Sequence, residues 1–365
     1  MRPVVVLGGY GNFGRPIVTA LAHEPDCRVL VCGRDLQKAT QLAEQAGGSA
    51  EPLALDCHGP DFAAELSRVG AFLVIHTAGP FQGQCYAVPR ACIDARAHYI
   101  DLADGRAFVG GIGELDSEAR DRNVLIVSGA SSLPALSSAV VDRLKESFSR
   151  IDRIDLGITS GARPPGEATM RGVLAYAGKP FTQWSDGEWR SVHGWQGLTR
   201  KRYPRPANVR WIANCDVPDL DLFPRRYRDV RTVRFRAGVA PRLNMLGIWL
   251  GSWVVRGRAL SSLVPYVPRL HRIAAALARF GSQTSAMHVT LHGLDLTNQS
   301  TSRTWFLLAR RDHGPLIPAF PAIALARKLL RGALPERGAM PCMGLLCVED
   351  ILTVGSHLDL QTVET

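Results

Sequence analysis

The sequence predicts an α/β protein in which a doubly wound parallel sheet is followed by a second, α+β domain. Three observations predict it. An apolar run opens the chain and leads directly into a glycine-rich turn. Short apolar runs and amphipathic stretches then alternate to about residue 130. Beyond about residue 151 the pattern changes, and the excess of basic residues begins.

The glycine-rich turn follows a strand-like run and precedes a helix-like stretch. Residues 4–14 read VVVLGGYGNFG, and their glycines fit both G-x-G-x-x-G and G-x-x-G-x-x-G. Such a turn holds a pyrophosphate with backbone N–H groups and the N-terminus of the helix. A simple strand-to-helix turn is the alternative, because the bare pattern is weak. The residues expected to contact the ligand are Gly8, Gly9, Gly11, Asn12, Phe13 and Gly14.

The alternation of strands and helices favours the ligand-binding interpretation. Strand-like runs lie at 3–8, 28–32, 51–55, 72–76, 98–102 and 124–128. Helix-like stretches lie between them, at 12–23, 36–46, 60–68, 84–96 and 108–122. Strict alternation implies right-handed crossovers and a parallel sheet with helices on both faces. The turn therefore stands where a Rossmann-type dinucleotide fold requires it.

The second part of the chain has a different pattern. A helix is expected at 131–148, a strand at 151–159 and a short helix at 166–177, and the region 243–280 is mostly helical. The remaining expected elements are antiparallel strands at 231–239, 286–294 and 302–309 and a final helix at 318–331. We expect a nucleotide-binding domain at 1–130, a second domain for substrate or dimerisation at 131–312, and a segment at 313–365 whose helices pack back on the first domain.

The charge of the chain is concentrated in the second part. Residues 1–150 hold 14 Lys and Arg against 17 Asp and Glu, whereas the rest hold 29 against 16. A solvated basic face explains this, as does attraction to an anionic substrate, an acidic carrier protein or a lipid headgroup surface. No nucleic-acid-binding motif accompanies the arginines. The eight cysteines show no metal-ligand spacing and no secretory signal opens the chain, so a cytoplasmic protein without a bound metal is expected.

The apolar run Met245–Val255 is too short to span a membrane, which takes ~20 residues. It predicts a buried or dimer-interface helix, or a helix that contacts a membrane surface.

The residues after the second strand indicate which dinucleotide is bound. An NAD site usually places an Asp or Glu there, but this chain has Arg34 first and Asp35 behind it. A guanidinium binds a 2′-phosphate well, so NADP is favoured over NAD. Arg15 could add a second positive charge. Alternatively, Arg34 is a solvated loop residue and Asp35 caps the next helix.

Residues at the ends of the next two strands are also placed to contact the cofactor. Asp56 ends the third strand, where its side chain can reach the adenine. A segment of small residues and one aromatic residue follows the fourth strand and can pass close to the ribose and nicotinamide: Thr77, Ala78, Gly79, Pro80 and Phe81.

At this point the chain resembles the saccharopine dehydrogenase-like oxidoreductases, in their broad bacterial branch. The motifs that carry the resemblance span most of the chain: Gly8–Gly14, Cys32–Asp35, Ala78–Phe81, His98–Asp104, Asn214–Asp219 and His313–Pro315. The resemblance implies an N-terminal NADP-binding domain, a second α/β domain inserted after it, and C-terminal helices that return to the first. It also implies hydride transfer to or from a C=N bond of an amino-acid-like substrate. Related proteins reduce C=C bonds of lipid chains, so a reductase of a lipid or acyl thioester is the alternative, and a protein that binds NADP without turnover is a third.

Candidate catalytic residues flank the fifth strand. Tyr99, Asp101 and Asp104 lie at the end of a strand where reactive groups of this fold gather, and we expect the segment from Asp101 to Arg106 to form the rim of the active site. Helix capping or ion pairing is the structural alternative for each. His76 could face the same crevice or be a buried, hydrogen-bonded histidine. Weaker candidates lie in the second domain: Asn214, Asp216, Asp219, His313, Trp184, Trp189 and Trp195.

Overall fold

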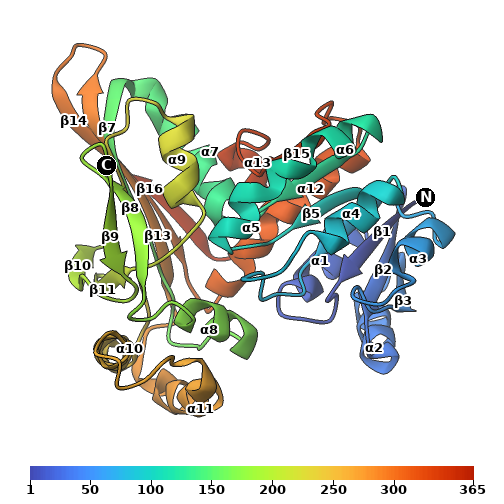
Figure 1. Ribbon diagram of the computed structural model, residues 1–365, viewed down its shortest axis with the longest axis horizontal. Helices are drawn as coiled ribbons and strands as arrows, with labels where there is room; N and C mark the ends of the chain where they lie inside the picture. Colours follow the sequence, from blue (N-terminus) through green and yellow to red (C-terminus); the bar gives the residue numbers. More distant parts are fainter. The chain divides into compact units, whose positions relative to one another are not determined.

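The computed structural model describes residues 1–365, apart from the side chain of Ala168, and the chain forms two compact units (Figure 1). The first unit comprises Met1–Leu136 and Leu316–Val354, and the second comprises Ser137–Pro315 and Gly355–Thr365. The chain therefore passes from one unit to the other three times. The expectation that all of 313–365 belongs with the first domain is wrong, because the last residues belong to the second unit.

The first unit is built on a sheet of seven parallel strands in the order β15-β6-β5-β4-β1-β2-β3. Six of them are the strands expected from the sequence, and the seventh comes from the C-terminal segment. Their bounds are β1 Arg2–Leu7, β2 Cys27–Gly33, β3 Ala50–Ala54, β4 Leu73–His76, β5 His98–Asp101, β6 Leu125–Ser128 and β15 Gly338–Pro341. Six of these strands follow one another in the order β3-β2-β1-β4-β5-β6, which is the strand order of a Rossmann fold. This order confirms the predicted architecture.

Helices connect these strands and cover the sheet. They are α1 Gly14–Leu21, α2 Leu36–Ala46, α3 Phe62–Arg68, α4 Ala87–Asp94, α5 Arg106–Gly111, α6 Asp116–Asp121, α12 Phe320–Leu330 and α13 Val348–Leu352, with short helical turns at Ile112–Leu115 and Ser132–Leu136. The apolar spacing of α2 works as expected, since Ala39, Leu42, Ala43 and Ala46 are its buried residues. Helix α12 contacts α1, so C-terminal helices do return to the first unit.

The core of this unit lies between the sheet and its helices. The central strands β4, β5 and β6 are buried at all four of their positions. Strands covered on both faces need apolar residues throughout, which is why they appear as continuous apolar runs and not as alternating ones.

The second unit is built on a seven-stranded mixed sheet in the order β10-β11-β12-β7-β13-β14-β16. The bounds are β7 Phe148–Thr159, β10 Thr199–Arg202, β11 Val209–Asn214, β12 Thr232–Gly238, β13 Ser285–Asp295, β14 Ser300–Ala309 and β16 Leu360–Glu364. The expectation of a purely antiparallel sheet is wrong in one place, because β12 pairs with β7 in parallel. The chain between them is long enough for the crossover that a parallel pair requires.

The other elements of the second unit surround this sheet. They are α7 Ser137–Leu144, α8 Glu167–Leu174, α9 Asp219–Arg226, α10 Arg242–Arg256, α11 Val267–Leu277 and the hairpin β8 Pro180–Ser185 with β9 Glu188–His193. Short helical turns occur at Lys145–Ser147, Val264–Tyr266, Ala278–Phe280, Gly314–Ala319 and Thr353–Gly355. Four strands and α9 lie between 178 and 226, where no element was expected. Among the described residues, no helix is long and apolar enough to cross a membrane.

The C-terminal strand completes the second sheet. β16 pairs antiparallel with β14, from Trp305 opposite Glu364 to Ala309 opposite Leu360. It therefore covers an edge of the second sheet, and only the segment before it belongs to the first unit.

Candidate functional site

The glycine-rich turn joins β1 to α1 and is shaped by its lack of side chains. Gly8 has φ +71°, a left-handed conformation that favours glycine. A Cβ on Gly14 would lie 2.3 Å from the carbonyl oxygen of Gly8, so the first turn of α1 packs directly on the loop. The N–H of Gly9 donates to the carbonyl of Cys32 at the end of β2 (3.0 Å). The turn thus brings the start of α1 close to the ends of both strands.

The N-terminus of α1 has the features of an anion-binding site. Phe13 occupies the N-cap position and makes no hydrogen bond with its side chain, so no side chain caps the first amide groups of the helix. Gly11 and Asn12 are exposed beside it. The first N–H groups of a helix attract phosphate, and here the glycines leave room for a pyrophosphate to approach. These residues fit a dinucleotide.

The end of β2 separates Arg34 from Asp35. Asp35 is the N-cap of α2, where its carboxylate accepts the N–H of Lys38 (3.2 Å) and pairs with the Lys38 ammonium (3.1 Å). These contacts lower the pKa of Asp35 through the Lys38 N–H and side chain. The predicted capping role of Asp35 is therefore confirmed. Arg34 is exposed at the same strand end.

Tyr10 and Arg15, from the glycine-rich turn and the start of α1, contact opposite ends of α2. The hydroxyl of Tyr10 accepts the N–H of Asp35 (3.2 Å), and its ring lies where a Cβ of Gly33 would be. Arg15 does not join Arg34, because its guanidinium donates to Gln45 near the other end of α2 (3.0 Å). Nine residues of helix span about 13 Å, so the two arginines do not form one site.

The remaining predicted cofactor residues lie at the ends of β3 and β4. The N–H of Leu55 donates to Gly33 (3.1 Å), which places the exposed Asp56 just beyond the end of β2, with its Oδ1 accepting the N–H of His58 (3.0 Å). Thr77 anchors the next loop to the glycine-rich turn, since its Oγ1 donates to the carbonyls of Leu7 (2.8 Å) and Gly8 (3.2 Å).

The loop after Thr77 has an exposed part and a buried part. Ala78 is partly exposed and Gly79 and Pro80 are exposed. Phe81 is buried, 4% exposed, and its ring packs against those of His76 (5.0 Å) and Phe108 (5.4 Å). The buried ring of Phe81 therefore anchors the loop to the core, while the residues before it form the accessible surface.

Asp101 does not lie at the rim of a site, contrary to expectation. It is fully buried, and its Oδ1 accepts hydrogen bonds from the N–H of Ala103 (2.9 Å), the hydroxyl of Ser128 (3.0 Å) and the N–H of Gly129 (2.8 Å). Burial raises its pKa to about 6, although these hydrogen bonds act in the opposite direction. Its carboxyl group connects the loops that follow β5 and β6, which is a positioning role.

Tyr99, another of the catalytic candidates, is buried as well and does not lie on an accessible surface. It is fully inaccessible, and its hydroxyl lies 3.0 Å from Nδ1 of His76. Burial, and next the charge of Asp101, raise its pKa well above the ordinary value. His76 is the buried, hydrogen-bonded histidine of the structural alternative, and burial lowers its pKa to about 4.

Asp104 is the one predicted catalytic residue that solvent can reach. It accepts a hydrogen bond from Nε2 of Gln82 (3.1 Å), which belongs to the loop after β4. Protein atoms crowd around the accessible carboxylate, and this desolvation raises its pKa while the Gln82 hydrogen bond opposes the shift. Arg106 follows two residues later, at the start of α5.

The weaker candidates of the second unit have structural roles. Asp219 is fully buried and accepts a hydrogen bond from Ser137, and burial raises its pKa to about 7. Trp195 is 1% exposed and donates to the carbonyl of Val173 (2.9 Å). Nδ1 of His313 accepts the N–H of Asp359 (3.0 Å).

The other named residues of this unit lie nearer the surface. Trp184 donates to the carbonyl of Val230 (2.9 Å), and its ring packs edge-on against that of Trp189 (5.1 Å). Trp189 is 46% exposed. Asn214 and Asp216 lie at and just beyond the end of β11, where the N–H of Asn214 donates to the carbonyl of Gln196 (2.8 Å).

A charged cluster on the second sheet was missed by the sequence analysis. Asp155 on β7 pairs with Arg153 (2.6 Å) and with His292 on β13 (3.2 Å), and its pKa is lowered to about 2 because these partners outweigh its desolvation. The half-buried Arg236 lies within the electrostatic reach of Asp155, and burial lowers its pKa. The alternation of arginines with apolar residues in β12 was the available signal.

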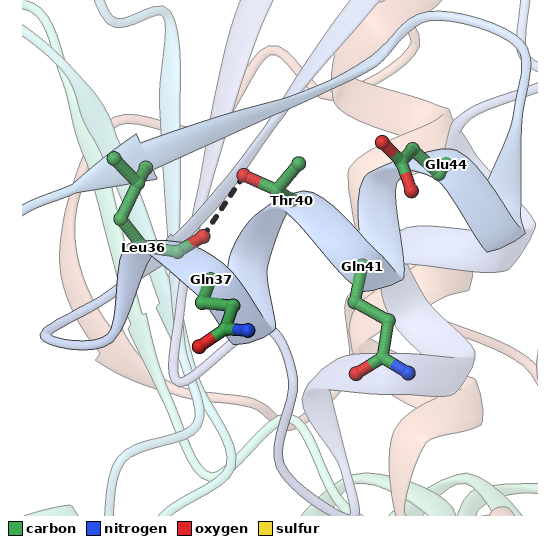
Figure 2. A pocket seen from close by; sticks show the side chains of 5 residues that line it. All are labelled: Leu36, Gln37, Thr40, Gln41 and Glu44. Carbon is green, nitrogen blue, oxygen red and sulfur yellow. Dashed lines mark hydrogen bonds between the residues drawn. The ribbon is translucent and has the colours of Figure 1, made fainter.

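A shallow depression lies along the exposed face of α2 (Figure 2). Its lining residues all belong to that helix: Leu36, Gln37, Thr40, Gln41 and Glu44. The hydroxyl of Thr40 donates to the carbonyl of Leu36 (2.9 Å) within the helix. The depression offers no converging polar groups from a second element, so we attach no chemistry to it.

The fold and the glycine-rich turn together define a dinucleotide-binding protein of the Rossmann class. Residues 4–133 match the family model of the saccharopine dehydrogenase NADP binding domain. The first unit is thus an NAD(P)-binding domain of the saccharopine dehydrogenase type. No protein with curated annotation matches the sequence.

Solved structures share the fold over the whole chain. Saccharopine dehydrogenase (L-Glu forming) from Saccharomyces cerevisiae superposes with a TM-score of 0.69 and 13% identity and covers 100% of both chains. The homospermidine synthase of Legionella pneumophila, solved with NAD, gives a TM-score of 0.60 and 10% identity over 100% of this chain and 91% of that one. At these identities the similarity establishes the fold alone.

Proposed function

We propose that the protein is an NADP-dependent oxidoreductase that transfers a hydride to or from a C=N bond of an amino-acid-like substrate. The family of the first unit and the full-length likeness to saccharopine dehydrogenase support the reaction class. NADP, when bound, supplies or accepts the hydride. The observation that carries the choice of NADP is the end of β2, where Asp35 is engaged as a helix cap and Arg34 is exposed.

The residues of the chain have distinct parts in this proposal. The N-terminus of α1 and the glycine-rich turn hold the pyrophosphate, and Arg34 recognises the 2′-phosphate. The loop 77–80 contributes to the ribose and nicotinamide side. Asp104 is the accessible carboxyl group that would exchange a proton with the substrate nitrogen, and Asp101 positions the backbone from which Asp104 projects.

The exposed Arg34 gives the first test. We expect Arg34→Ala to weaken NADPH binding by roughly 10- to 100-fold, because a charge-assisted hydrogen bond contributes about 1.5–3 kcal/mol, and to leave NADH binding nearly unchanged. Arg68→Ala is the matched control, since the exposed Arg68 pairs with Glu65 on α3 and should affect neither. Calorimetric titration of both nucleotides measures this. Tighter binding of NADH than of NADPH by the unaltered protein would contradict the assignment.

A second candidate is a reductase of a C=C bond in a lipid or acyl thioester. The exposed apolar side chains of α10 favour it, because they offer an apolar surface to a lipid chain. NADPH consumption with pools of 2-oxo acids plus amines, compared with pools of enoyl thioesters, separates the two. Binding of NADPH without consumption in either pool would indicate a protein that binds the cofactor without turnover.

A further inference from the structure

The apolar face of α10 points to solvent. Its most exposed large side chains are Leu243, Leu246, Leu250, Trp253 and Val254, with exposed fractions from 36% to 62%. Their spacing places them on one stripe of the helix, whereas Met245, Ser252 and Val255 form the buried side. The expectation of a buried helix is therefore wrong for this stripe. Helix α10 is apolar on the side where surface helices are normally polar.

The following helix adds a mixed basic and apolar stripe. Arg269, Arg272 and Ile273 are exposed on α11, and Arg279 and Phe280 continue at the same spacing just beyond it. Ile273 is 56% and Phe280 65% exposed. The two helices, drawn in orange at the lower edge of the view in Figure 1, hold eight of the twelve exposed large hydrophobic residues of the described chain, together with the turns beside α11.

The charge of this region has one sign. From Val230 to Leu294 the chain contains nine arginines and no aspartate or glutamate. Six of these arginines belong to α10, α11 and the segments beside them, and all six are exposed: Arg242, Arg256, Arg258, Arg269, Arg272 and Arg279. We call this surface of exposed apolar side chains and six arginines the α10–α11 face.

We propose that the α10–α11 face binds the surface of an anionic lipid membrane. Apolar side chains that enter the headgroup boundary, flanked by arginines that attract acidic lipids, are what such a surface requires. Fifteen residues of α10 extend about 22 Å, less than the ~30 Å hydrocarbon core, so the helix lies on the membrane. The inference does not depend on the proposed function.

A second copy of the chain fits this face poorly. In a two-fold contact the same patch meets itself, so the six arginines of one copy would face the six of the other. No acidic residue of the segment would separate them, and like charges placed together in an interface cost several kcal/mol. A negatively charged surface has the complementary sign.

Vesicle flotation of the full-length protein tests the proposal. We expect it to bind vesicles of phosphatidylcholine with phosphatidylserine at about 50 mM salt, to release at about 500 mM, and not to bind phosphatidylcholine alone. Arg269→Gln/Arg272→Gln/Arg279→Gln should weaken binding on the order of 100-fold, from about 1 kcal/mol per arginine. Leu243→Ser/Leu250→Ser/Trp253→Ser should weaken it by roughly tenfold or more.

The matched controls are exposed residues outside the face. Leu296→Ser, at a side chain that is 71% exposed, and Arg122→Gln in the first unit should bind like the unaltered protein. The proposal is overturned if both triple variants bind normally or if phosphatidylcholine alone binds equally well. It is also overturned if the apolar triple variant converts a dimer to a monomer in light scattering, or if polyglutamate binds as tightly as the vesicles.

Discussion

Asp101 shows how one buried carboxyl group can organise a site without entering it. Three donors from two loops converge on its Oδ1, while its Oδ2 has no hydrogen-bond partner among the described residues. The group is held in a place where its charge is costly. Losing those hydrogen bonds would leave two backbone N–H groups and a hydroxyl buried without partners.

Asp101→Asn should reveal this cost as a change in how the free energy of unfolding depends on pH. The folded pKa of about 6 lies above the ordinary 3.8, so ionisation of Asp101 removes stability as pH rises through that range. Asparagine keeps an oxygen acceptor and does not ionise. Relative to the unaltered protein, the variant should therefore gain up to about 3 kcal/mol in free energy of unfolding between pH 4 and pH 7.

Urea unfolding at these two pH values measures the difference. Asp121→Asn is the matched control, because Asp121 is exposed, and its difference from the unaltered protein should stay constant. A constant difference for Asp101→Asn as well would refute the argument.

Sequence and structure agree at some residues of the site and disagree at others for a physical reason. The cap at Asp35 was predictable because capping depends on a local pattern. The burial of Tyr99 and Asp101 was not, since all four positions of β5 are buried and one of the helices that contact this strand, α12, begins more than 200 residues later. The Arg153–Asp155–His292 cluster joins residues up to 139 positions apart in the sequence, and only the strand register reveals it.

At the scale of elements, those with a clear period were predicted and those without were missed. Strands β1 to β6 of the first sheet and helices α1, α2 and α12 follow apolar patterns that burial imposes, whereas the short strand β15 was not predicted. Strands β9 and β10 are rich in charged residues and are exposed or half-buried throughout, so their alternation carries little apolar signal. Helix α10 was recognised as an apolar run, but the run alone left open whether the helix is buried, lies at a dimer interface or contacts a membrane surface.

The connection from β1 to α1 gives a prediction at this scale. A methyl group on Gly14 would lie 2.3 Å from the oxygen of Gly8 and 2.7 Å from the Cα of Gly9, both backbone atoms. Gly14→Ala should therefore displace α1 from the turn, at a cost of about 1–3 kcal/mol, and weaken NADPH binding by roughly tenfold or more.

Gly110→Ala is the control for this variant. Gly110 lies in α5 with no atom within 4 Å of the added Cβ, so alanine should stabilise that helix slightly and leave NADPH binding unchanged. Fluorescence titration with NADPH measures both. Equal affinity of Gly14→Ala and the unaltered protein would show that the tight packing is not needed for binding.

At the scale of the whole molecule, three buried histidines set the response to acid. Burial lowers the pKa of His76 and His98 to about 4 and of His288 to about 3, below the ordinary 6.5. Unfolding exposes imidazoles that then take up protons, so each contributes stability that is lost as pH falls below 6.5. The raised pKa values of Asp101 and Asp219 have the opposite effect, because these two groups add stability as the pH falls. The sum of their two pKa shifts is smaller than the sum of the three histidine shifts.

We therefore expect the free energy of unfolding to fall by about 2 kcal/mol between pH 6.5 and pH 4.5. His98→Gln should flatten this dependence, whereas His357→Gln, at an exposed position, should leave it unchanged. Guanidinium unfolding at a series of pH values provides the test. A protein that is more stable at pH 4.5 than at pH 6.5 would contradict the prediction.

The late strand of the first sheet has a consequence for synthesis. Ser128 ends β6, and its partner β15 begins at Gly338, about 210 residues later. At the usual ~5–20 residues per second, a ribosome needs roughly 10–40 s to make that stretch. Throughout this interval the nascent chain carries an unpaired sheet edge in which three of the four residues are apolar. Slow translation or a shortage of chaperones should therefore reduce the yield of this protein before its finished stability matters.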